Sequence, residues 1–321
     1  MNEIALEQQT PPNRIKTKAS LGRELWNNRW LYLFVFPGVV WFLVFAYSPM
    51  YGILIAFKEY DIIEGVFRSP WVGFRHFTDF FHDYNFKSIM RNTICISFLK
   101  LAFGFPAPII LALLLTEVRN VLFKRVAQTI SYLPFFVSWV VVAGIWYELF
   151  SIDDGSLINS LLLKLNLIHE PIHWFGEQKL FWGFVVVSDI WKNVGFATII
   201  YLASIAGINP EQYESAVIDG ANRMRQIWHI SLPSIRPTII LLLILGMGGI
   251  LNAGFDQIFV MQNPMVAEKA QIIDTYVVNA GLFDGNYEIA TAVGLFKSVV
   301  GLALLLTVNF IVKLLGEEGI L

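Results

Sequence analysis

Ionisable side chains lie inside apolar stretches of this 321-residue chain that are long enough to cross a bilayer. A charged group near the centre of a membrane helix costs about 2.5–3.5 kcal/mol on insertion scales, so such residues point to function. Asp189 and Lys192 are three residues apart and share one face of a helix. They either neutralise each other or line a hydrated path. Lys100 and Lys297 could each reach the membrane surface, pair with an acid on another helix, or face a cavity.

Further polar and aromatic residues accompany these charges. Placing such polar groups in lipid is unfavourable, which indicates that they have a function. Trp191 and Asn193 flank Lys192, and a second group lies farther along the chain. We expect the following residues to face one translocation route: Asp189, Trp191, Lys192, Asn193, Asn252, Asp256 and Gln257.

Enzyme motifs are weak or missing. The segment from His169 to His173 matches the zinc-protease pattern H-E-x-x-H, which needs both imidazoles on one helical face. Pro171 disfavours that helix beyond a first turn, and no third ligand is evident, so we expect no metal site. The chain has no G-x-x-x-x-G-K-[ST] and no nucleophile elbow. We therefore expect a protein that is not an enzyme, holds no cofactor and takes its energy from a partner.

A polar segment between two apolar stretches, residues 209–233, has the signals of two short helices joined at a glycine. Asn209 is a good N-cap, and Pro210 suits the first helical position. Gly220 stands where the first helix should stop in a left-handed conformation. A second helix is predicted from about Ala221 to Ser231, ended by Pro233. Because the bilayer does not require such a loop, we interpret it as a binding surface in water.

Composition places these features in a membrane protein. Hydrophobic residues make up 56% of the chain and charged residues 15%, against about 25% in soluble domains. The net charge of −2 gives no indication of nucleic-acid binding. The single cysteine, Cys95, cannot form an intramolecular disulfide. Six spans are predicted, near Trp30–Phe57, Thr93–Leu115, Ala127–Phe150, Phe181–Ala206, Thr238–Val260 and Ile289–Val312.

Lys and Arg are modestly enriched in the segments that are cytoplasmic if both termini lie inside. This predicts a cytoplasmic arm (1–29), which could include an interfacial helix, and a first transmembrane helix (30–57). An extracytoplasmic loop (58–91) and a five-helix core (92–312) follow, with the cytoplasmic loop at 207–237 and a cytoplasmic tail at 313–321. Aromatic residues at one-sided helical spacing, Phe74, Phe77, Phe80, Phe81 and Tyr84, predict a helix on the outer membrane face, with partner docking as the alternative.

The cytoplasmic loop resembles that of the permease subunits of ATP-binding-cassette importers, whose pattern is Glu-Ala-Ala-x3-Gly-x9-Ile-x-Leu-Pro. Glu214, Ser215 and Ala216 stand for the first triplet, and only Ser215 departs from it. Gly220 and then Ile230, Leu232 and Pro233 complete the pattern. The resemblance implies that these residues, together with Asp219, contact an ATPase.

Five further segments resemble the subfamily that imports oligosaccharides or polysaccharide fragments. They are Tyr47–Gly52, Trp71–Phe74, Tyr132–Trp139, Ile190–Phe196 and Gly254–Phe259. An aromatic ring such as Trp191 covers the apolar face of a pyranose, and an amide such as Asn193 meets its hydroxyls. The resemblance therefore implies a large carbohydrate as substrate.

The resemblance also implies a fold, a location and partners. The fold is an all-α integral membrane protein of six transmembrane helices, the type I importer permease (MetI-like) fold with a cytoplasmic coupling helix, in the bacterial cytoplasmic (inner) membrane. The implied partners are a second, homologous permease, two ATP-binding-cassette ATPase subunits that bind the ATP, and an extracytoplasmic sugar-binding protein. The alternative is an ion-coupled secondary transporter acting alone. A transporter acting alone has no ATPase for the cytoplasmic loop to bind. The sequence also shows no duplicated half, which an inverted-repeat secondary transporter would have.

Overall fold

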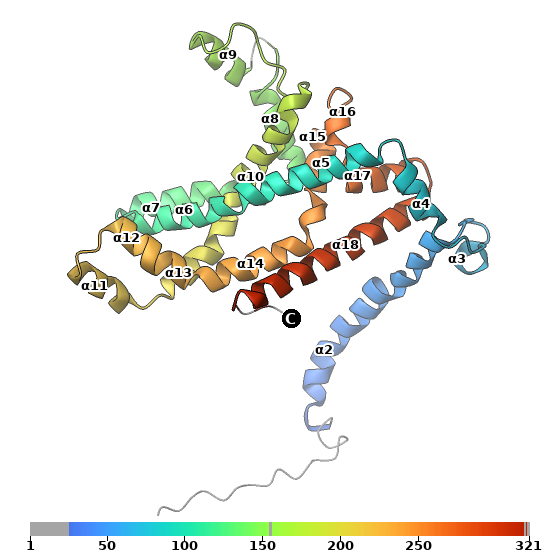
Figure 1. Ribbon diagram of the computed structural model, residues 1–321, viewed down its shortest axis with the longest axis horizontal. Coiled ribbons are helices and arrows are strands. Elements are labelled where there is room, and N and C mark those ends of the chain that lie inside the picture. The colour runs from blue at the N-terminus through green and yellow to red at the C-terminus, as the bar shows by residue number, and fades with distance from the viewer. Residues whose placement is uncertain (1–25, 154–155, 318, 320–321) are drawn as a thin grey trace, which may run out of the picture. The chain divides into compact units, whose positions relative to one another are not determined.

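The computed structural model describes residues 26–153, 156–317 and 319, and over these ranges the chain is helical without a β-strand (Figure 1). An isolated antiparallel bridge joins Lys58 and Trp71. The chain divides into two units, Met1–Gly52 and Ile53–Leu321. Most of the predicted cytoplasmic arm, including Leu21 and Leu25 of the proposed interfacial helix, lies outside the described residues.

The first unit consists of α2 (Arg29–Phe42), the π-helical turn η1 (Leu43–Tyr47) and the start of the 3₁₀ helix η2 (Ser48–Phe57). Pro37 lies inside α2, where it removes one backbone donor without ending the helix. No residue of α2 is buried within the chain, and after Arg29 the helix is apolar on every side. Such a helix requires the hydrocarbon of a bilayer or another subunit around it.

Among the described residues, four helices are long and apolar enough to cross a membrane: Arg29–Phe57, Phe86–Glu117, Gln178–Ala206 and Tyr287–Leu314. Two bent helix pairs bring the number of candidate spans to as many as six.

The second unit has the following elements: α3 (Gly65–Arg68), α4 (Arg75–His82), α5 (Phe86–Leu99), η3 (Lys100–Gly104), α6 (Pro106–Glu117), α7 (Val121–Tyr132), η4 (Leu133–Phe136), α8 (Trp139–Leu149), α9 (Leu157–Lys164), α10 (Gln178–Ala206), α11 (Pro210–Ile218), α12 (Arg223–Gln226), η5 (Ile227–Ser231), α13 (Leu232–Ser234), α14 (Arg236–Gly248), η6 (Ile250–Asn252), α15 (Phe255–Met261), α16 (Ala267–Ala270), α17 (Ile273–Val278), η7 (Asn279–Phe283) and α18 (Tyr287–Leu314).

Two of the predicted spans are not continuous helices. Val121–Phe136 and Trp139–Leu149, which cover the third span, meet at an angle of 108°. The predicted fifth span, Thr238–Val260, is interrupted between α14 and α15, where Ala253 and Gly254 have φ angles of +48° and +91°. Left-handed residues cannot continue a right-handed helix, so the backbone changes direction there. Irregular backbone at membrane depth is tolerated where it is enclosed by protein or lines a water-filled cavity.

Helix α10 is central to the second unit because buried side chains on several of its faces meet other elements. Phe181 and Val185 pack with Ile96 of α5 and Ile258 of α15. Tyr201 and Ile205, near its other end, pack with α6 and with Ile235. The neighbouring helices α14 and α18 lie side by side (Figure 1). Packing around α10 therefore sets the positions of the polar groups that α5, α10 and α15 carry.

The aromatic residues at helical spacing lie only partly on α4, which contains Phe77, Phe80 and Phe81, whereas Phe74 precedes it and Tyr84 follows it. Phe80 of α4 is buried with Ile89, Ile273 and Val293, and its ring contacts Tyr276. By contrast, Phe74 and Tyr84 are exposed. The buried side of α4 therefore packs against α5, α17 and α18, and its position on the outer membrane face stays a prediction.

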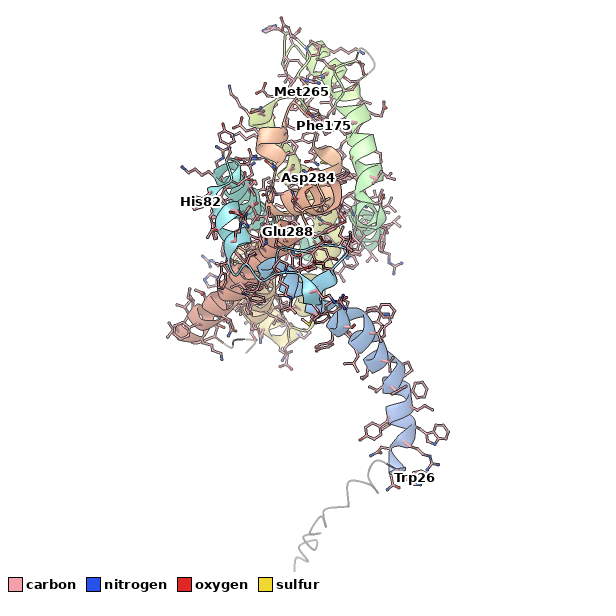
Figure 2. All side chains as sticks on the ribbon, turned by 90° about the vertical axis from the view of Figure 1, so that its right-hand side faces the viewer. Trp26, His82, Phe175, Met265, Asp284 and Glu288 are labelled. Carbon is pink, nitrogen blue, oxygen red and sulfur yellow. The ribbon has the colours of Figure 1, made fainter. Side chains whose placement is uncertain are left out.

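The ends of the long helices carry different elements. The α11–α12 loop lies at one end of the second unit, and α4 and α16 lie at the other (Figure 1). Phe175 and Met265 lie together at the end that carries α16 (Figure 2), where the Asn263 amide donates to the Phe175 carbonyl. The helices thus separate the polar α11–α12 loop from the loops between α8 and α10 and between α15 and α17.

Candidate functional site

The ammonium of Lys100 is the centre of the polar cluster inside the helices. Lys100 opens the π-helical turn η3 at the end of α5. Its Nζ donates to Asp189 Oδ1 at 3.1 Å and to Gln257 Oε1 at 2.6 Å. Asn193 Nδ2 donates to the same carboxylate oxygen at 3.1 Å. One cation therefore joins α5, α10 and α15, and π-turns are frequent at functional sites.

Gly254 allows this close approach of Lys100 to the break between α14 and α15. A Cβ built on Gly254 would overlap Lys100 Nζ, and its φ of +91° is one that side-chain-bearing residues rarely adopt. Gln257 is fully buried and donates to the Val185 carbonyl at 2.6 Å and to Ser188 Oγ at 2.7 Å. Gln257 therefore anchors α15 to α10 rather than facing an open route.

The ion pair between Asp189 and Lys192 that their spacing predicts is not formed. Asp189 pairs with Lys100, and Lys192 Nζ instead donates to the Phe135 carbonyl at 2.8 Å. The same ammonium lies 5.3 Å and 5.4 Å from the ring centres of Phe135 and Trp139. A helical residue three positions away shares a face, but a long lysine side chain reaches whichever acceptor the packing brings near. Lys192 therefore supports the bend between η4 and α8.

A pocket of about 480 Å³ adjoins the Lys100 cluster. Three of the predicted pathway residues, Asp189, Asn193 and Asn252, line it together with Lys100 and Ser97. The pocket lies between α5–α6, α10 and the segment from α14 to Gly254. Its walls combine apolar side chains with a few convergent polar groups, which is the usual character of a ligand site.

A second pocket of about 490 Å³ shares Asn252 and Gly254 with the first. Asp256, Asp274 and Trp139 also line it. Lys297, which the sequence alone left without a partner, pairs with Asp274 across α18 and α17. The irregular segment Gly249–Gly254 thus contributes residues to both pockets.

Trp191 lies apart from these two pockets. Its ring meets Trp146 edge-on, with centroids 5.9 Å apart, and the side chain is partly exposed. The structure therefore divides the predicted pathway residues into three groups. Asp189, Asn193, Asn252 and Asp256 line the two pockets, Lys192 and Gln257 make structural contacts, and Trp191 lies on another part of α10.

The segment with the H-E-x-x-H pattern adopts no helix. Residues 168–173 lie in a bend and irregular backbone between α9 and α10. His169 and His173 therefore do not share a helical face, which is the arrangement that this zinc motif requires.

The first helix of the polar loop begins and ends as predicted. Asn209 caps α11 by accepting from the Glu211 amide at 3.1 Å. Gly220 has a φ of +75°, and the amide of Ala221 donates to the Ala216 carbonyl at 2.8 Å. Val217 and Ile218 on α11 are 62% and 85% exposed. Glu214, Ser215 and Asp219 are also exposed, so α11 presents a mixed apolar and acidic surface.

The second helix of the loop differs from the prediction. It runs through α12, η5 and α13 to Ser234, and Pro233 lies at the start of a helical turn rather than ending the helix. Proline is tolerated in a first turn because its missing amide has no partner there. The direction changes by 56° before α14. Ile235, at this bend, is fully buried with Tyr201 and Ile205 of α10, which anchors the loop to the membrane helices.

Two bonds hold the loop together. Tyr213 of α11 shares a hydrogen bond of 2.9 Å with Ser231 of η5. Arg223 pairs with Glu117 at the end of α6. Ile230 and Leu232 are half-buried, whereas Pro233 is exposed. The loop therefore has a fixed structure and is attached to α6, α10 and α14.

An all-helical chain with several membrane-spanning helices, charged groups inside them and a structured polar loop defines a multi-pass membrane transport component. Residues 104–317 match the family described as binding-protein-dependent transport system inner membrane component, and the chain belongs to this family. It is accordingly a transport component and not an enzyme.

Two curated relatives come from Bacillus subtilis (strain 168). Protein LplB is 47% identical over 293 residues, covering 91% of this chain and 91% of the relative. The polygalacturonan/rhamnogalacturonan transport system permease protein YteP is 44% identical over 297 residues, covering 92% of each.

The fold is also that of a solved importer. A chain in the crystal structure of a bacterial alginate ABC transporter, in complex with an alginate pentasaccharide-bound periplasmic protein, is 37% identical. It superposes with a TM-score of 0.86 over 94% of this chain and 100% of that chain. This agreement shows the importer permease (MetI-like) fold.

Two site residues were missing from the predicted pathway set. Lys100 was recognised as an intramembrane charge, but nothing local in the sequence indicates its partner, which lies 89 residues away. The sequence does not identify Ser97 as a site residue, because serine is common in membrane helices. A pairing rule for intramembrane charges would have linked Lys100 to an acid such as Asp189.

Proposed function

We propose that the chain is one of two permease subunits of an ATP-driven importer and forms half of the translocation pathway for an oligosaccharide or polysaccharide fragment. Family membership supports a permease that works with a binding protein. The relatives' substrates support a carbohydrate, since polygalacturonan, rhamnogalacturonan and alginate are all polysaccharides. An ion-coupled transporter acting alone would need no binding protein.

In this proposal the chain crosses the membrane six times, with α7–α8 and α14–α15 as broken spans. Both termini and the loop 207–237 are cytoplasmic. Asp189, Asn193, Asn252 and Asp256 face the pathway at different stages of transport, because they line two pockets that meet at the break before α15. Broken helices at the site are a recurring device in transporters, where they expose backbone groups to the substrate.

The observation that carries the proposal is the exposed surface of α11. Ile218 is 85% exposed on a helix that is capped at both ends and anchored through Ile235. Val217 beside it is 62% exposed, and contiguous apolar surface on a polar loop is typical of a protein contact. We infer that α11 is the coupling helix, which binds a cleft on the ATPase and transmits its closure to α10 and α14. Glu214, Ser215, Ala216, Asp219 and Gly220, with Ile230, Leu232 and Pro233, form or support this contact.

The importer would also contain a second, homologous permease, two ATPase subunits that bind ATP, and an extracytoplasmic sugar-binding protein. In this arrangement the chain itself holds no cofactor. ATP binding closes the ATPase dimer, and the coupling helices carry that movement to the spans, which alternate between inward-facing and outward-facing states.

Substitution of Gly220 tests the coupling role. At a φ of +75° a β-branched side chain is strongly disfavoured, so Gly220→Val should distort the turn after α11. We expect the protein to remain in the membrane while ATPase co-purification and sugar-stimulated ATP hydrolysis fall together, by about fivefold or more for a strain of about 1–2 kcal/mol.

Gly220→Asn is the matched control, because asparagine adopts the left-handed region several times more readily than most residues. It should retain most of the coupling. Full ATPase binding and full coupling in Gly220→Val would show that α11 is not the coupling helix.

A further inference from the structure

Ser97 carries a buried hydroxyl without a partner at the edge of the 480 Å³ pocket. The residue is 5% exposed, and its Oγ has no hydrogen-bond partner among the described residues. An unsatisfied buried polar group costs about 1–3 kcal/mol. Native structures contain few of them, and each calls for an explanation such as a bound group from outside the chain. Since Ser97 lines the pocket, a ligand there can reach it.

Lys100 lies one helical turn from Ser97 and lines the same pocket. Its ammonium has three donors. Among the described residues two acceptors take them, Asp189 Oδ1 and Gln257 Oε1. The absence of a side chain on Gly254 leaves the space that Nζ occupies. One ammonium donor and the Ser97 hydroxyl therefore remain for an acceptor in the pocket.

We infer that Ser97 and Lys100 form a subsite for the carboxylate of a uronic acid unit within the transported oligosaccharide, an inference that rests on the proposed function. An ionised carboxylate is acceptor-only and can take both donors at once. Hydrogen bonds between an ammonium and a carboxylate are about twice as strong as those between neutral groups. The polymers named for two similar proteins, alginate and polygalacturonan, consist of uronic acids.

The arrangement also explains how such a carboxylate is released. Asp189 competes with the sugar for the same ammonium, and its Oδ1 is held in place by Asn193. Repulsion between the Asp189 carboxylate and a uronate carboxylate on the same ammonium opposes binding, so the subsite binds the uronate weakly. A transport route requires this, because a group that binds too tightly does not leave.

The test uses the complete importer in proteoliposomes, with both permeases, the ATPases and saturating loaded binding protein. The probes are oligogalacturonate and alginate trisaccharides, each beside its carboxyl-reduced, neutral form. Ser97→Ala should lower the ratio of acidic to neutral uptake by about tenfold or more, the lower end of the effect of losing a hydrogen bond to a charged group. Its thermal stability should be unchanged or higher, because an unpaired buried hydroxyl has been removed.

Lys192 supplies the control, because it is also a lysine inside the helices but donates to the Phe135 carbonyl and lines neither the 480 Å³ nor the 490 Å³ pocket. Lys100→Gln should lower the acidic-to-neutral ratio, whereas Lys192→Gln should leave the ratio as in the wild type. If Lys100→Gln fails to assemble, Ser97→Ala alone decides.

An unchanged ratio in Ser97→Ala would overturn the subsite. So would a wild-type importer that carries the neutral probes and none of the acidic ones. If no probe at all is taken up with ATP, the proposed importer function fails instead, and the two failures are thereby distinguished.

Discussion

The ammonium of Lys100 links the end of α5 to α10 and α15 through hydrogen bonds. Its contribution to stability depends on how deeply the ion pair is buried. The side chains of Lys100 and Asp189 are 15% and 22% exposed. Breaking a buried pair by removing one partner costs about 3–5 kcal/mol, because it leaves an uncompensated charge in a poorly solvated place. Partial exposure reduces this cost. Lys192 differs, because its ammonium is satisfied by the Phe135 carbonyl and two aromatic rings.

A double-mutant cycle should distinguish the two possible partners of Asp189. Lys100→Met and Asp189→Asn should each destabilise the protein by about 2–4 kcal/mol. The double variant should lose less than the sum, with a coupling energy of at least about 1 kcal/mol. The free energy of unfolding can be followed by titrating the detergent-solubilised protein with SDS.

The same cycle with Lys192→Met in place of Lys100→Met is the control. Its coupling to Asp189 should be below about 0.5 kcal/mol, within the additivity expected of residues that do not pair. Equal coupling in both cycles would mean that Asp189 divides its charge between the two lysines.

At the scale of elements, the contact between α7 and α10 depends on one glycine. A Cβ on Gly195 would overlap the backbone carbonyl of Ser131. Small residues allow the backbones of membrane helices to approach closely. Just after this contact, the rings of Phe135 and Phe196 stack with centroids 3.8 Å apart. Gly195 therefore fixes where the third span bends, which in turn positions the Phe135 carbonyl for Lys192.

Gly195→Ala should destabilise the protein by about 1–3 kcal/mol, the usual effect of forcing a methyl group into a filled space. Gly183→Ala, in the same helix, is the control because no atom lies within 4 Å of the added Cβ. That substitution should be neutral or slightly stabilising, since alanine favours helix more than glycine does. Thermal unfolding of the two purified variants gives the comparison, and equal midpoints would contradict the close contact.

At the scale of the whole molecule, the proposed orientation places α11 in the cytoplasm and the loop after α4 outside. These segments lie at opposite ends of the long helices (Figure 1). Ile218 is 85% exposed and Tyr84 is 97% exposed, so cysteines at either position would be accessible. The chain has one native cysteine, Cys95, which can be replaced first.

In a Cys95→Ser background, Tyr84→Cys should react with a membrane-impermeant maleimide in intact cells. Ile218→Cys should react only after the membrane is permeabilised. Labelling of the variants is compared on gels, with the Cys95→Ser chain as the blank. The reverse pattern would invert the topology and remove α11 from the ATPase.

The amino-acid sequence by itself determined the features that depend on near neighbours. Apolar length predicts helices long enough to span a membrane, and the part of the chain that the structure describes contains four continuous ones. The caps of α11 and the left-handed turn at Gly220 follow from Asn209, Pro210 and the glycine itself, because each acts within one turn of backbone. These signals are local, so they can be recognised before the chain is folded.

The tertiary structure decided which distant groups meet. Lys100 bonds to Asp189 and Gln257, which are 89 and 157 residues away, and no periodicity indicates such pairs. Likewise, Phe80 turned out to be buried because α17 and α18 supply a surface for it. A buried charge or ring takes the partner that helix packing brings within a few ångströms. That packing depends on all the helices together, so it cannot be inferred from the sequence of any one helix.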